Sequence, residues 1–289
     1  MGRHAQGVVL IILSAIAFSS AGFFTRLIHL DAWTMLFWRG LFAGLMILCV
    51  IALQQRRSTI AAIRAIGRLG FAAALCSTAA TILYLNALRR TSVADVAMIF
   101  AAAPFLTAAL GWLFLGITAA WTTLAASLVA LFGITIMVSG AATEGYLIGD
   151  LLAFAMNVCM AIMLLIIRHQ QHIRMLPAAC LSALLCPLLV WPFAAPLAIG
   201  AQDLFYLFLF GTAQFGLGLL FLTLGGRLIS ATENALITTV EAPMAIAWVW
   251  LCFDETPATT SLVGGTIVMA AVAAHLWHGS RSMIASGAT

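Results

Sequence analysis

The stretch that decides the fold runs from residue 93 to residue 117 and reads VADVAMIFAAAPFLTAALGWLFLGI. Its only charged residue is Asp95, at the third position. A helix needs about 20 apolar residues to cross the hydrocarbon layer of a bilayer. This stretch is long enough and lacks the alternation of a barrel strand, so it predicts a transmembrane helix.

Nine further stretches of the same kind surround it, and together they predict an all-α polytopic membrane protein with ten transmembrane helices. The ten stretches are 8–24, 33–53, 69–88, 93–117, 121–138, 146–167, 176–197, 204–224, 235–253 and 259–277.

The composition of the whole chain agrees with this interpretation. Of its 289 residues, 64% are hydrophobic and 8% are charged. A soluble fold carries roughly 25% charged residues, so a soluble enzyme, a disordered chain and a nucleic-acid binder are excluded. The six cysteines lie in apolar stretches without CxxC spacing, and no nucleophile elbow or phosphate loop occurs. We therefore expect no enzyme activity, catalytic residue, metal or cofactor.

The arginines predict the orientation in the membrane. All 13 basic residues are arginine, and cytoplasmic loops are enriched in basic residues. With a cytoplasmic N-terminus, most arginines fall inside, and only Arg26, Arg89 and Arg90 fall outside, with Arg39 just within the second helix. Ten crossings then return the C-terminus to the cytoplasm.

An internal repeat divides the chain into residues 1–143 and 144–289, with five predicted helices each. Ala103-Pro104 and Ala242-Pro243 share one offset, which also relates Phe114 to Phe253 and Asp95 to Asn234. Because five is odd, the second copy would be inverted in the membrane, an arrangement typical of transporters. Apolar helices can also resemble one another through composition alone.

Several short motifs carry a family resemblance. They are Trp38-Arg39, Tyr84 with Ala87-Leu88 and Thr91-Ser92, Pro104, and Pro243 followed by Phe253-Asp254-Glu255. With these motifs the chain resembles the EamA-type drug/metabolite transporters. The resemblance implies ten helices from a duplicated five-helix unit. It is greatest to exporters of aromatic and other apolar amino acids in the bacterial inner membrane, which implies a multi-pass protein of that membrane.

Glu241 is the acidic residue that lies well within a predicted span. A charge at mid-membrane costs about 3 kcal/mol, so it should face a cavity or a partner. It could hold a substrate ammonium or take up a proton, or be a neutral acid hydrogen-bonded between helices. The neighbouring Pro243 and its counterpart Pro104 are candidate hinges, because proline removes a helical hydrogen bond.

Other polar and aromatic residues complete the candidate substrate site. Asn157 and Gln214 are amides that could recognise an amino-acid backbone or bond helices to each other. An amphipathic pocket is predicted from one face of the third helix and two aromatic residues: Ser77, Thr81, Tyr84, Phe100 and Trp248. Arg39 could pair with a substrate carboxylate, but its position favours snorkelling to water at the membrane boundary.

These residues predict an exporter of small amphipathic metabolites, above all amino acids including aromatic ones. It would work by alternating access around a central cavity between the two repeats. Its partners would be the small-molecule substrate and the lipid bilayer, without nucleic acid. Gly40 and Gly44 form a GxxxG pattern that serves either internal packing or a homodimer, so a monomer and a homodimer both remain open. The alternatives are a multidrug or lipophilic-cation exporter, an intramembrane enzyme, and a membrane sensor or assembly factor without transport.

Overall fold

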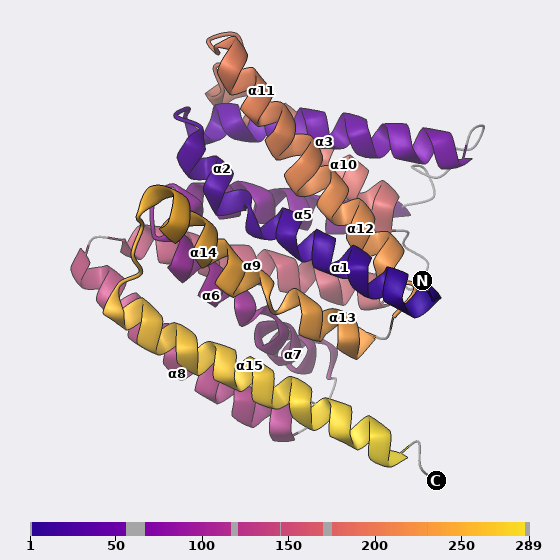
Figure 1. Ribbon diagram of the computed structural model, residues 1–289, viewed down its shortest axis with the longest axis vertical. Coiled ribbons are helices and arrows are strands. Elements are labelled where there is room, and N and C mark those ends of the chain that lie inside the picture. The colour runs from indigo at the N-terminus through magenta and orange to yellow at the C-terminus, as the bar shows by residue number, and fades with distance from the viewer. Residues whose placement is uncertain are drawn as a thin grey trace.

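The computed structural model describes residues 2–55, 67–116, 121–144, 146–169, 175–229 and 231–286. Throughout these ranges the regular structure is helical (Figure 1). The first part of the chain contains α1 (Arg3–Ser19), α2 (Ala21–Leu27), α3 (Ala32–Gln55), α5 (Gly67–Leu88), α6 (Val93–Ala101), α7 (Ala103–Leu115) and α8 (Trp121–Glu144).

The rest of the chain continues the same pattern. It contains α9 (Leu147–His169), α10 (Met175–Val190), the short 3-10 helix η1 (Trp191–Phe193), α11 (Ala201–Leu209), the π-helix η2 (Phe210–Leu217), α12 (Gly218–Gly225), α13 (Ala231–Thr238), α14 (Glu241–Phe253) and α15 (Thr259–Ser286). Each predicted stretch thus contains helix, and the all-α class is confirmed.

By length and composition, six of the described helical segments can cross a membrane, and the bent pair α6–α7 makes a seventh. Apolar helices of 10–17 residues lie in α8, α14 and α15. These findings fit a polytopic membrane protein, while ten crossings and cytoplasmic termini stay predictions. The start of α1 and the end of α15 lie toward the same side of the bundle, at the right in Figure 1.

Three of the predicted spans are broken into two helices. The helix α6 ends one residue before α7, with a bend of 44°, just ahead of Pro104. The break between α13 and α14 comes just ahead of Pro243. The break between α1 and α2 has no proline. There the hydroxyls of Ser19 and Ser20 donate to the carbonyls of Ile16 and Ala17, at 2.9 and 2.7 Å, a pattern that bends helices.

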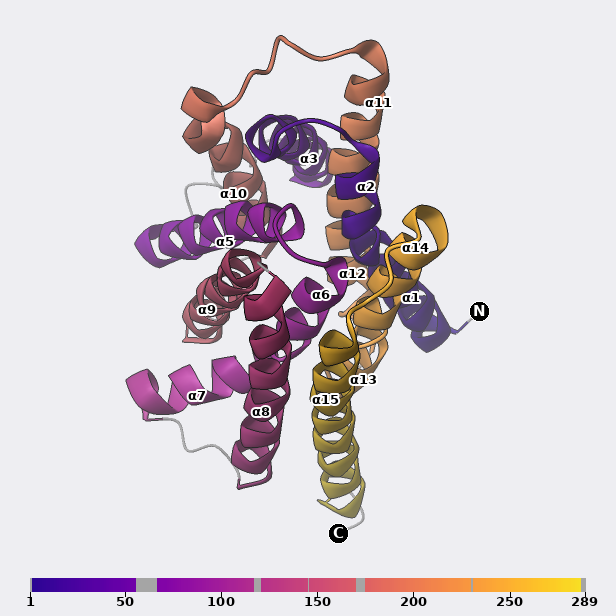
Figure 2. The same cartoon turned by 90° about the vertical axis from the view of Figure 1, so that its left-hand side faces the viewer.

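The helices pack in a regular set of pairs (Figure 2). α3 packs on α10, α8 on α15, and α6 on α14. In addition, α5 packs on α9 and α1 packs on α12. The pairing of α3 with α10 explains the GxxxG pattern: a Cβ atom on Gly40 would lie 2.8 Å from the carbonyl oxygen of Ala183, and one on Gly44 would lie 2.5 Å from Leu184. This pattern therefore serves internal packing.

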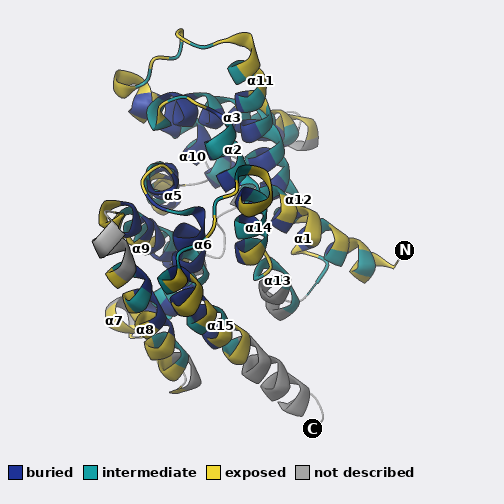
Figure 3. Ribbon diagram, turned by 60° about the vertical axis from the view of Figure 1, so that its left-hand side comes forward, coloured by how far each residue is buried: buried dark blue, intermediate teal, exposed yellow. Residues whose placement is uncertain are grey.

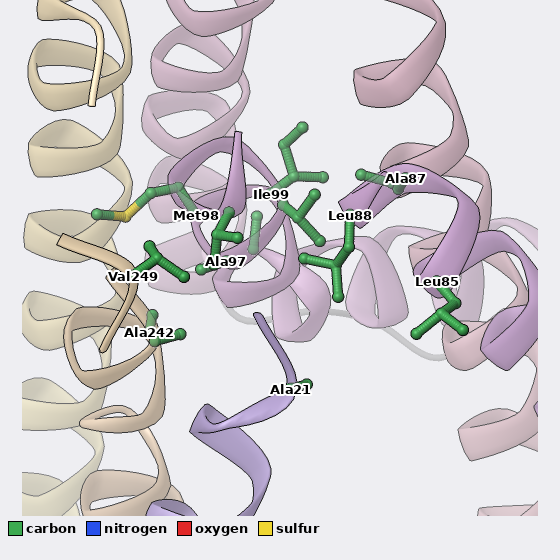
Figure 4. Close-up of a cluster of buried hydrophobic side chains, with 14 of the residues drawn as sticks. Ala21, Leu85, Ala87, Leu88, Ala97, Met98, Ile99, Ala242 and Val249 are labelled. Atoms are coloured by element: carbon green, nitrogen blue, oxygen red, sulfur yellow. The ribbon is translucent and has the colours of Figure 1, made fainter. Parts of the chain in front are cut away.

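The buried core joins the broken helices at the centre of the bundle. Figure 4 shows Met98 of α6 close to Val249 and Ala242 of α14, with Leu88 and Ala21 beside them. Large apolar side chains on α8 and α14 are exposed instead, among them Leu128, Phe132 and Leu251. Figure 3 colours the ribbon by exposure and shows exposed stretches on both helices. An apolar exterior of this kind is suited to lipid contact.

Candidate substrate site

Arg39 lies on α3 and is buried, with 4% of its surface exposed. Its Nε and Nη2 atoms donate to Oε1 of Gln214 on η2, at 3.2 and 3.1 Å. The expectation that Arg39 snorkels to water is therefore wrong. The connection between α10 and α11 covers this end of α3, where Trp38 donates to the carbonyl of Pro196 and Thr34 accepts from the backbone of Ala195.

The neighbours of Arg39 leave its charge without an acidic partner. Its guanidinium carbon lies 4.9 Å from the ring centroid of Phe210 and 4.7 Å from that of Phe215, within cation–π range. Within the described ranges, no carboxylate forms an ion pair with it. Its Nη1 donates no hydrogen bond there and is not closed off from solvent. The guanidinium thus keeps spare donors.

Tyr84 on α5 is half-buried, and its phenol lies within electrostatic range of Arg39 and of Glu241. Glu241 is the half-buried first residue of α14, directly after the break in that span. Within the described part of the chain, its carboxyl accepts no hydrogen bond and forms no ion pair, and its oxygens are not closed off from solvent. Glu241 and Arg39 are thus an acid and a base that form no ion pair within the described ranges.

Ser77 and Thr81 precede Tyr84 on α5 and are half-buried. Their helical spacing places them on the same face of α5 as Tyr84. The hydroxyls of Ser77, Thr81 and Tyr84 form no hydrogen bond with other described residues and are not closed off from solvent. This face of α5 therefore carries polar atoms free to bind a ligand.

The two predicted aromatic residues lie at the broken helices. Phe100 is half-buried near the end of α6. Trp248 donates from Nε1 to Oγ of Ser19 at 3.1 Å, and its ring makes an edge contact with Phe23. Trp248 thus links α14 to the break between α1 and α2.

The two predicted amides have partners inside the bundle. Asn157 on α9 is 1% exposed and donates from Nδ2 to the carbonyl of Ile99, in the last turn of α6, while its Oδ1 is enclosed without a partner among the described residues. Gln214 is 2% exposed. It accepts from Arg39 and donates to the carbonyl of Phe18 at 3.4 Å. Asn157 supports the α6–α7 break, and Gln214 holds Arg39.

The sequence of this chain is similar to a known family, and its fold is similar to that of a known protein. Residues 5–139 match the EamA-like transporter family. A protein of known crystal structure shares the fold with a TM-score of 0.65, at 14% identity, over 93% of this chain and 96% of that chain. No curated protein matches this chain in sequence. The EamA-like match and the apolar helices together support a membrane transporter.

The site is built across the limits of the EamA-like region. Arg39 and Tyr84 lie within residues 5–139, whereas Gln214, Glu241 and Trp248 lie beyond them. Within the described ranges, no group of three histidine, cysteine or acidic side chains is arranged to hold a metal ion.

A second polar cluster lies at one end of the bundle, which we call the Arg26 end. There α2, α5 and α14 end, and α3, α6, α9 and α15 begin. Arg26 forms an ion pair with Glu255, with Nε 2.7 Å from Oε2, and donates to the carbonyls of Leu88 and Thr91. Glu255 also accepts from the backbone of Val93 at 3.0 Å, at the start of α6. The sequence analysis placed Arg26 outside and named Glu255 in a motif, without pairing the two residues.

Buried carboxylates adjoin this cluster. Asp95 accepts hydrogen bonds from Ser92 and from Ser261 at the start of α15. Asp150, in the first turn of α9, accepts from Thr91 at 2.7 Å. These bonds tie the helix ends of both halves together at the Arg26 end.

Proposed function

We propose that the protein exports small amphipathic metabolites, above all amino acids including aromatic ones, by alternating access. Two inverted halves, residues 1–143 and 144–289, would rock about a shared site. Both termini would be cytoplasmic, in the inner membrane of a bacterium. In such transporters the substrate binds near the middle of the membrane, where helices are interrupted.

The observation that carries the proposal is the set of unpaired polar groups inside an apolar bundle. Polar groups within a membrane are costly, so those retained there usually serve substrate or ion pathways. Glu241 would bind the substrate ammonium, and Ser77, Thr81 and Tyr84 would bind its polar groups. Phe100 and Trp248 would pack against its apolar side chain, while Asn157 and Gln214 would hold the polar wall in place.

The packing of the helices supports two exchanging halves. The third predicted helix of each half packs on the first predicted helix of the other half, as α5 on α9 and α12 on α1. The fourth predicted helices, each interrupted before a proline, pack on each other as α6 and α14. The match to residues 5–139 ends near the proposed boundary. Pro104 and Pro243 would act as hinges.

The test is counterflow of radiolabelled amino acids into vesicles that contain the purified protein, with and without a pH gradient. We expect uptake of apolar and aromatic amino acids by the wild type and a large loss with Glu241→Gln. Quaternary ammonium compounds are the matched competitors, because the alternative function, export of lipophilic cations, also needs one membrane acid. Uptake of these cations without uptake of amino acids would replace the proposal by that alternative.

A further inference from the structure

The guanidinium of Arg39 has the features of a binding group for an anion. It is a buried cation whose direct hydrogen-bond partner, Gln214, is a neutral amide, and an amide does not balance a full charge. The rings of Phe210 and Phe215 pack against it within cation–π range and carry no negative charge either. Burying an unpaired charge is costly, so a negatively charged ligand gains by supplying the missing partner.

Local structure holds this guanidinium in one place. Gln214 lies in the π-helix η2, and such segments occur frequently at functional sites. The π-helix packs closely against α3, since a Cβ atom on Gly211 would lie 2.8 Å from the carbonyl oxygen of Arg39 itself. The amide of Gln214 is in turn fixed by its bond to the carbonyl of Phe18. The donors that remain free, including Nη1, keep a fixed direction.

We propose that Arg39, held by Gln214, binds the carboxylate of the transported substrate. This assignment rests on the proposed function and narrows its substrate class. A compound that carries a carboxylate and an ammonium together would supply an acidic partner to Arg39 and a cationic partner to Glu241, which both lack an ion pair in the described ranges. The planar fork of N–H donors in arginine matches the two oxygens of a carboxylate better than the ammonium group of a lysine would. The site therefore selects zwitterions over lipophilic amines.

The test compares uptake of phenylalanine with uptake of phenethylamine, the same molecule without its carboxylate, in vesicles. For the wild type we expect a rate ratio of at least about 10 in favour of phenylalanine, since a hydrogen bond to a charged group contributes roughly 10-fold or more. Arg39→Gln should bring this ratio close to one. Arg39→Lys should give an intermediate ratio.

A second variant covers the case in which Arg39→Gln does not fold. Gln214→Glu has nearly the same shape and places a carboxylate at hydrogen-bond distance from Arg39. It should form an ion pair that occupies the guanidinium, so the ratio should fall as with Arg39→Gln. The matched control is Arg89→Gln, at the exposed end of α5, which should leave the ratio unchanged.

The outcomes separate this assignment from the proposed function. Equal uptake of both compounds by the wild type, or an unchanged ratio in folded Arg39→Gln or Gln214→Glu, would overturn the carboxylate assignment and leave a transporter. Failure of the wild type to move either compound, or any amino acid, would overturn the proposed function and this assignment with it.

Discussion

Arg26 on α2 and Arg39 on α3 differ in what neutralises their charges. Arg26 keeps 24% of its side chain exposed, yet it has a carboxylate partner in Glu255 and two carbonyl partners. Arg39 is almost fully buried, and its partners among the described residues are a neutral amide and two phenyl rings. The less buried arginine thus has the more complete set of partners, which is the reverse of what stability alone would favour.

This difference indicates two roles. The bonds of Arg26 join α2, the α5–α6 connection and the end of α14, so they close one end of the bundle as a structural joint. The charge of Arg39 has no acidic partner among the described residues, which fits the binding role that we propose for it. The following substitutions test this division of roles.

The largest effect should come from Arg26→Gln. It leaves Glu255 and the carbonyl of Leu88 without their partner, and we expect a loss of about 2 kcal/mol in the free energy of unfolding, discounted for partial exposure. Thermal unfolding of the purified protein in detergent measures it. The double variant with Glu255→Gln should recover part of the loss. An unchanged unfolding temperature in Arg26→Gln would show that the bonds of the Arg26 end do not stabilise the fold.

Glu241→Gln should have the next largest effect, and on transport rather than stability. Its carboxyl has no partner in the described part of the chain, so folding should be unchanged. The KM for phenylalanine should rise roughly 10-fold, since one charge-assisted hydrogen bond contributes about 1.4 kcal/mol or more. Glu233→Gln, at the start of α13 on the N-terminal side, is the control. A normal KM would remove Glu241 from the site.

Tyr84→Phe should have a smaller effect. It removes a hydroxyl that is free to bind the substrate and keeps the ring, so we expect the KM for phenylalanine to rise roughly 5-fold, or about 1 kcal/mol. Initial uptake rates at several substrate concentrations measure this change. The control is Tyr206→Phe, whose hydroxyl lies at the exposed start of the α11 span. Equal KM values for wild type and Tyr84→Phe would place the phenol outside the site.

Asn157→Ala should have the smallest effect. Its amide donates to the carbonyl of Ile99 at the α6–α7 break, and a hydrogen bond between membrane helices contributes about 0.6 kcal/mol. We expect a slightly lower thermal stability with an unchanged KM. A large change in KM at constant stability would mean instead that Asn157 contacts the substrate.

Much of the fold could be predicted from apolar stretches and prolines. The run from residue 93 to residue 117 is a helical pair with its break before Pro104, because a proline cannot complete the helical bonding pattern in any context. The break between α1 and α2 also had a local signal, the adjacent Ser19 and Ser20, since serine pairs are a common cause of kinks.

The candidate site could be predicted only in part. Glu241 and Tyr84 could be found from their position in apolar stretches. The burial of Arg39 could not, because it depends on the α10–α11 connection and on Gln214, which is 175 residues away in the chain. The π-helix that presents Gln214 left no signal in composition or spacing.

The central claim is that two opposite charges inside the bundle bind one zwitterion. Equilibrium binding to the purified protein tests it with phenylalanine, phenethylamine and 3-phenylpropionate, against Arg39→Gln and Glu241→Gln. The account predicts that Arg39→Gln weakens binding of 3-phenylpropionate but not of phenethylamine. Glu241→Gln should weaken binding of phenethylamine but not of 3-phenylpropionate. Either variant should weaken binding of phenylalanine. Equal losses for all three compounds in both variants would contradict it.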